Sequence, residues 1–143
     1  MKNIVLPLPP TDNRRLRPIA RRNPKAKGGY IAVLIKEECY REWEERAAVE
    51  WVVWKSAHPT FQPYEPSVKA QMAFDMAIYL PSNRSDIANY SKAVADFLGG
   101  GKSPRLFTDD HYVSLRLVLP VTVDKINPRV EINPVPYIYG KGA

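Results

Sequence analysis

Hydrophobic and polar positions alternate without interruption from Val68 to Leu80, and this run is the clearest structural signal in the chain. Every second side chain is apolar, whereas those between are mostly polar or small. A period of two residues sustained over this length predicts a β-strand with one buried face. Pro81 and Asn83 follow the run, and residues of these types end strands.

Two other segments repeat their apolar positions every three or four residues, which predicts amphipathic helices. The longer helix is predicted from Lys36 to about Ala57, and its apolar face indicates core or a subunit interface rather than a platform for stacked bases. That face holds Tyr40, Trp43, Ala47, Trp51 and Trp54. The shorter helix is predicted to open at about Asp86 and to end at Gly99. Its buried stripe holds Ile87, Tyr90, Val94, Phe97 and Leu98.

Shorter strands are predicted at residues 4–8, 30–34, 112–119 and 129–135. The resulting order, β-β-α-β-α-β-β, has a strand–helix–strand crossover at its centre. This order predicts an α+β fold, with a mixed β-sheet of about four to five strands and two main helices on one face. A length of 143 residues fits a single domain, residues 1–143.

Composition narrows the classes of function. Cys39 is the only cysteine, which excludes a disulfide framework and a zinc site built from several thiolates. No apolar run approaches the length of a membrane span, so we expect a cytoplasmic protein with no membrane partner. The net charge of +6 and the pI of about 9.5 are compatible with a polyanionic partner such as nucleic acid.

The basic charge is concentrated in residues 14–27, which contain no acidic residue. Neighbouring asparagine, proline and glycine residues predict that residues 13–29 form a loop. Such a loop can neutralise several phosphates, and phosphate contacts dominate affinity for nucleic acid. The alternative is a solvated surface segment. The predicted phosphate contacts are Arg14, Arg15, Arg17, Arg21, Arg22, Lys25 and Lys27.

Carboxylates and a lysine gather around the predicted crossover. We expect it to bring Asp86, Asn89, Lys92 and Asp110 towards one corner of the sheet. Carboxylates suit a hard divalent cation, Mg²⁺ with Mn²⁺ as a substitute, and a nearby lysine can stabilise charge on a phosphodiester. Asp86 and Asp110 are then the predicted metal ligands, with Asp109 as a further candidate.

Each of these residues also has a simpler interpretation. Asp86 can cap the helix, Asn89 and Lys92 can be plain surface residues, and Asp109 and Asp110 can form an acidic turn before a strand. Because all of these residues lie around one crossover, we favour a common metal and phosphodiester site over these separate roles.

Three motifs resemble those of the RusA-type Holliday-junction resolvases. Residues 6–14, Leu-Pro-Leu-Pro-Pro-Thr-Asp-Asn-Arg, are similar to the family's Leu-Pro-x-Pro-Pro-Ser-x-Asn-x opening. Residues 84–92, Arg-Ser-Asp-Ile-Ala-Asn-Tyr-Ser-Lys, are similar to its Arg-x-Asp-x-Asp-Asn-x-x-Lys signature. Residues 106–113 resemble its apolar-x-Asp-Asp-x-x-Val stretch. The order and spacing of the motifs agree over nearly the whole chain.

The resemblance implies a homodimeric, Mg²⁺-dependent endonuclease that resolves four-way DNA junctions by paired symmetric nicks. Hydrolases of this family act in DNA recombination and repair and are commonly encoded by bacteriophages and prophages. The resemblance places the catalytic segment at residues 84–113, with metal ligation by Asp86 and Asp110 and catalytic help from Lys92. It implies DNA contacts by Asn13, Arg14, Arg84 and Asn89.

The chain departs from the family at one position, because the second aspartate of the signature is replaced by Ala88. The isolated loss of one ligand is typical either of a substitution introduced to inactivate an enzyme or of a naturally inactive relative. We therefore expect a protein that binds branched DNA but cleaves it poorly. The alternative is a non-catalytic, structure-selective nucleic-acid-binding protein.

Overall fold

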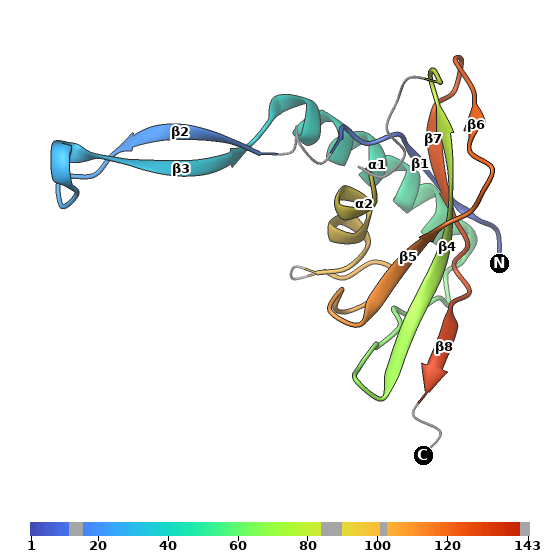
Figure 1. The fold of residues 1–143 in the computed structure, drawn as a ribbon. Helices are drawn as coiled ribbons and strands as arrows, with labels where there is room; N and C mark the ends of the chain where they lie inside the picture. Colours follow the sequence, from blue (N-terminus) through green and yellow to red (C-terminus); the bar gives the residue numbers. More distant parts are fainter. Residues whose placement is uncertain (12–15, 84–89, 101–102, 141–143) are drawn as a thin grey trace.

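The computed structural model describes residues 1–11, 16–83, 90–100 and 103–140. They form one small α+β domain with two helices and a six-stranded mixed sheet, from which a two-stranded hairpin projects (Figure 1). The predicted fold class is confirmed, although the sheet has more strands than the four to five expected. No helix within the described residues is both long and apolar enough to cross a membrane.

The long alternating run forms β4, Ala70–Leu80, which is the central strand of the sheet. β4 pairs antiparallel with β7 and β8 and parallel with β5 and β6. β1 pairs with β7 and forms an edge of the sheet. The bounds are β1, Ile4–Pro7; β5, Val113–Leu117; β6, Thr122–Val123; β7, Arg129–Ile132; and β8, Tyr137–Gly140. The sequence prediction missed β6 and β8, which are short and lie beside prolines.

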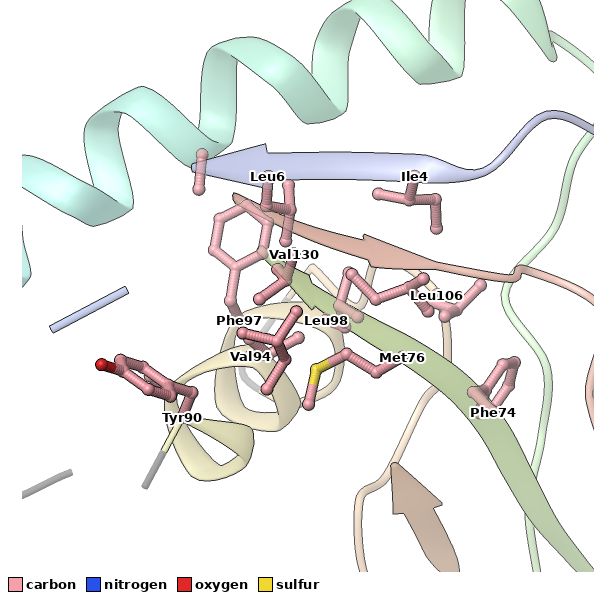
Figure 2. Packing of buried hydrophobic residues seen from close by; sticks show 14 of the residues in the cluster. Ile4, Leu6, Phe74, Met76, Tyr90, Val94, Phe97, Leu98, Leu106 and Val130 are labelled. Atoms are coloured by element: carbon pink, nitrogen blue, oxygen red, sulfur yellow. The ribbon is translucent and has the colours of Figure 1, made fainter. Parts of the chain in front are cut away.

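The inner face of the sheet and the stripe of α2, Ser91–Leu98, meet in one hydrophobic core (Figure 2). Val94, Phe97 and Leu98 of α2 are at most 4% exposed, and Met76 of β4 is 2% exposed. Fully burying a side chain of this size stabilises the fold by about 1.5–3 kcal/mol. The alternation along β4 and the helical spacing in α2 therefore serve the same core.

The second helix, α1, Glu38–Ala57, packs along the edge strand β1. The indole Nε1–H of Trp43 donates to the carbonyl oxygen of Pro7 at 2.6 Å, and that of Trp54 donates to the carbonyl oxygen of Lys2 at 2.8 Å. Trp43 also packs edge to face on Phe97 of α2. The aromatic face of α1 is thus part of the core, and it caps carbonyl groups at the exposed edge of the sheet.

The basic segment is a hairpin rather than the predicted loop. β2, Leu16–Arg22, pairs antiparallel with β3, Tyr30–Lys36, along its whole length. Gly28 and Gly29 have φ of 81° and 78° at the turn, a backbone region that glycine occupies without steric cost. We call residues 16–36 the arm. Figure 1 shows the arm pointing away from the body, beyond the N-terminal end of α1.

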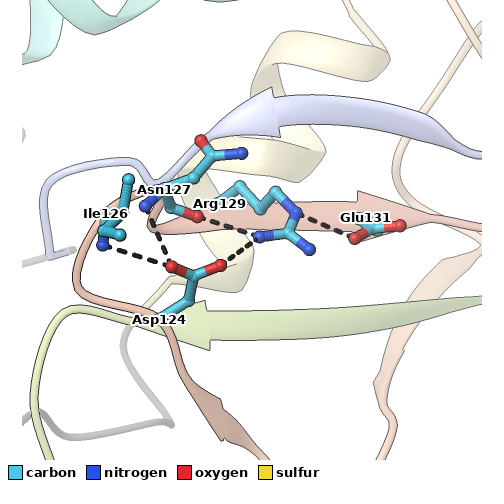
Figure 3. A network of polar contacts seen from close by, with 5 residues as sticks. All are labelled: Asp124, Ile126, Asn127, Arg129 and Glu131. Atoms are coloured by element: carbon cyan, nitrogen blue, oxygen red, sulfur yellow. Dashed lines mark hydrogen bonds and ion pairs between the residues drawn. The ribbon is translucent and has the colours of Figure 1, made fainter.

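A polar network fixes the turn that leads into β7 (Figure 3). Asp124 accepts hydrogen bonds from the backbone N–H groups of Ile126 and Asn127, at 3.2 and 3.0 Å. The Arg129 guanidinium donates to Asp124 and to Glu131, both at 2.9 Å. The N–H groups and the guanidinium lower the pKa of Asp124 below its ordinary value. The network fixes the course of the chain between β6 and β7.

Candidate functional site

Asp109, Asp110 and His111 form a tight turn directly before β5. Asp109 Oδ1 accepts a hydrogen bond from the His111 backbone N–H at 3.0 Å and lies 2.6 Å from His111 Nδ1. Asp110 Oδ1 lies 4.0 Å from the same ring nitrogen. One side of the turn is anchored by Phe107, which is fully buried, and the other by the pairing of β5 with β4. A rigid frame therefore presents two carboxylates to solvent.

The charges in this turn are coupled. The pKa of Asp109 lies below its ordinary value because the His111 backbone N–H, and then its ring, donate to the carboxylate. The pKa of His111 is raised, mainly by the hydrogen bond to Asp109 and then by the charge of that carboxylate. A divalent cation beside the two aspartates would repel a protonated ring, so it would oppose this shift.

The donor set partly fits the expected metal. Ligand atoms from the three side chains lie within 4.8 Å of one another, and the aspartate side chains are 48% and 42% exposed. Carboxylate oxygens suit Mg²⁺ and Mn²⁺, whereas an imidazole suits softer metals. Because Asp109 Oδ1 already accepts bonds from His111, Asp110 has the freer carboxylate. A hard cation would need further oxygen ligands from outside this turn.

Of the other residues predicted for the catalytic segment, only Lys92 lies in the part of the chain that the structure describes. Arg84, Asp86, Ala88 and Asn89 lie outside the described residues. Lys92 lies in the first turn of α2 and is exposed, and it makes no ion pair with any described carboxylate. The C-terminal end of α2, not its start, adjoins the segment that leads to the turn, because the Leu98 carbonyl accepts the N–H of Leu106. The segment that leads to Asp110 is thus joined to the end of α2 opposite to Lys92.

The predicted single corner of the sheet stays a prediction, because Asp86 and Asn89 lie outside the described residues. The described strands show what separates the two segments that would have to meet there. β4 and β5 are parallel, and Met72 pairs with Val113. Asp110 therefore lies beside the start of β4, whereas the chain leaves β4 at Leu80, eight residues further along. At about 3.3 Å per residue, these two points are roughly 26 Å apart.

The start predicted for the shorter helix is wrong. α2 begins at Ser91 rather than at about Asp86, and Tyr90 has the non-helical backbone angles of a cap residue. The apolar residues at the start of the predicted stripe extended the expected helix too far towards the N-terminus.

The arm carries most of the predicted phosphate contacts. Arg17, Arg21 and Arg22 lie on β2, and Lys25 and Lys27 lie at the tip; all five are exposed. Asn13, Arg14 and Arg15 lie outside the described residues. Only Arg17 of the five has an ion pair within the described chain, with Glu37 at 3.9 Å. The arm is therefore a cationic projection open to an anionic partner.

His111 adjoins both aspartates in the structure but was not predicted as a site residue, because isolated histidines carry no ligand spacing. The signal was its place directly after two aspartates and before a strand. Beside it, a shallow hollow of about 230 Å³ opens on the sheet. The polar side chains that line it are Gln71, His111, Tyr112, Ser114 and Tyr139. This hollow adjoins the acidic turn and leaves it accessible.

No protein-family model matches the chain, and no curated protein shows significant similarity to it.

Proposed function

We propose that this protein is a divalent-metal-dependent endonuclease of the RusA type that acts on four-way DNA junctions as a homodimer. The observation that carries the proposal is the half-exposed pair Asp109 and Asp110, held rigidly at the start of β5 on a chain that also projects a cationic arm. The three sequence motifs that resemble the RusA-type family support the reaction class, the cleavage of four-way DNA junctions. Ala88 then makes this chain a weak nuclease.

The chemistry assigns a role to each part. A bound Mg²⁺ supplies Lewis-acid chemistry and makes water a better nucleophile at a phosphodiester. Asp110 offers the freer carboxylate for that ion, and Asp109 holds the turn through its bonds to His111. The arm binds phosphates and holds the DNA by charge rather than by reading bases. Paired nicks in a junction with twofold symmetry require two copies of the site, which is why we propose a homodimer.

The test is restoration of the missing carboxylate. We expect Ala88→Asp to raise Mg²⁺- or Mn²⁺-dependent nicking of a four-way junction by several orders of magnitude, and to leave junction affinity nearly unchanged. A linear duplex with the same arm sequences should be cut far less. Adding Asp110→Asn to the restored protein should abolish the gain, whereas adding Glu65→Gln, an exposed acid elsewhere, should not.

The second candidate is a non-catalytic, structure-selective nucleic-acid-binding protein. Two observations favour it: Ala88 cannot ligate a metal, and the exposed basic residues of the arm suit an anionic partner without any catalytic group. Junction binding that survives in EDTA, together with no nicking by Ala88→Asp on any branched substrate, would establish it in place of the nuclease.

A further inference from the structure

The arm has apolar side chains on both of its faces. Its antiparallel register places Ile19, Val33 and Ile35 on one face and Tyr30 and Leu34 on the other. Tyr30 is 62% exposed and Leu34 is 65% exposed. Within the described chain the two strands contact chiefly each other. Because an isolated two-stranded hairpin is marginally stable in water, this arm requires a surface that covers it.

Nucleic acid alone does not match this surface. Phosphates attract the cations of the tip, residues 23–29, and the three arginines of β2, but the aliphatic side chains between those arginines and along β3 do not bind phosphates. We call the paired strands, residues 17–22 and 30–35, the shaft. Their apolar character calls for another protein surface, whereas the tip remains suited to DNA.

A second uncovered apolar surface lies on the outer side of α1. Val49, Val52 and Val53 are 61–62% exposed, and their spacing of three and four residues places them together. Valine is a poor helix former, so three exposed valines weaken the helix relative to polar residues of higher propensity. Contiguous exposed apolar residues commonly mark an interaction site.

The two surfaces are complementary in charge. The arm has six basic residues and no acidic residue, whereas α1 has five glutamates and three basic residues. Glu45 and Glu50 flank the valines, and neither forms an ion pair with a described residue. Opposite charges around an apolar centre favour docking in one register.

The dimensions of the two elements also agree. Seven residues per strand give the arm a length of about 24 Å, and twenty residues give α1 a length of about 30 Å. The arm extends beyond the N-terminal end of α1 (Figure 1). Two copies related by a twofold axis can therefore lay each arm along the other's helix, which is a self-complementary interface.

We propose that the shaft of one copy docks on Val49, Val52 and Val53 of a second copy, that the exchange is reciprocal, and that the basic tip stays free for DNA. This rests on the homodimer within the proposed function and not on nuclease chemistry. A shaft face of roughly 20 by 10 Å, two strands wide, used twice and counted on both partners, buries on the order of 800 Å². That is the low end for protein interfaces, where weak complexes lie.

Disulfide trapping between two different variants tests the contact directly. Leu34→Cys protein mixed with Val52→Cys protein should give a covalent dimer on mild oxidation, at least tenfold more than either variant alone. Ile126→Cys is the matched control, because Ile126 is 96% exposed on the turn before β7. Mixing Leu34→Cys with this control should give only background. Equal yields in the two mixtures, or no trapping in the first, would overturn the proposal.

Sedimentation separates this inference from the wider proposal. Leu34→Asp and Val52→Asp should each raise the dimer Kd by at least about thirtyfold, the effect of losing one hot-spot residue, whereas Ile126→Asp should not. All three sites are exposed, and circular dichroism checks that the variants fold. If the wild type is a dimer and both the arm variant and the helix variant remain dimers, the docking of the shaft on α1 is refuted, whereas the proposed homodimer is not. If they remain dimers but lose DNA binding, the shaft covers DNA instead. If the wild type is a monomer, the homodimer of the proposed function is refuted as well.

Discussion

Replacing Trp43 with phenylalanine tests whether α1 holds the edge strand as the hydrogen bonds indicate. Trp43 is 2% exposed, and its indole donates to Pro7 at 2.6 Å. The residue thereby fixes the end of β1, from which the chain continues towards the arm. Phenylalanine keeps an aromatic ring in the core but cannot donate.

Two contributions determine how far Trp43→Phe lowers the free energy of unfolding. An acceptor left without its partner in a partly buried position costs about 1–3 kcal/mol. The smaller ring leaves a cavity beside Phe97, at a cost of about 1–2 kcal/mol, which is less than the loss on truncation to alanine. The free energy of unfolding should therefore fall by roughly 2–5 kcal/mol, a large fraction of the total for a domain of this size.

Two other tryptophans of the same helix provide matched controls. Trp54→Phe also loses a hydrogen bond, to Lys2, but at the chain terminus, so it should cost about half as much. Trp51 is half-buried and donates to no other described residue, so Trp51→Phe should cost less than about 1 kcal/mol. Urea unfolding at one fixed protein concentration measures all three. Equal losses for Trp51→Phe and Trp43→Phe would refute the role of the hydrogen bond.

Three further outcomes follow from particular contacts. Because the pKa of Asp124 is lowered by folding, its stabilising effect exists above the ordinary aspartate pKa and is lost as the pH falls; Asp124→Asn should lower Tm at pH 7, and the difference should disappear in acid. Gly99→Ala should cost about 1–3 kcal/mol in urea unfolding, since its Cβ would overlap the buried Phe107 ring. Removing Lys25 and Lys27 together should reduce the slope of log K for DNA against log salt by about 2, equally for all sequences.

The sequence predicted those elements whose signal is local. The alternation that forms β4 and the spacing that forms α1 are set by burial on one face, and both appeared within two residues of the expected bounds. The strand predicted at residues 30–34 forms most of β3, whereas β2 was missed, because its few apolar residues lie on both faces of the arm and are interrupted by Pro18 and by arginines. Residues 13–29 were therefore predicted to form one loop. A turn signal was present in Gly28 and Gly29, directly before the apolar run of β3.

For the acidic turn, the local sequence predicts which strand it precedes but not which distant residues lie near it. Asp109 and Asp110 were identified correctly as neighbours of a strand, because that depends only on where β5 begins. Their relation to Lys92 depends on the direction of β5 relative to β4, which periodicity does not contain. A crossover between parallel strands leaves one strand at its far end and enters the next at its near end, so the helix must cross the length of the sheet in between. Residues just after the first strand and just before the second therefore begin at opposite ends, and any catalytic use of both depends on long-range geometry rather than on sequence spacing.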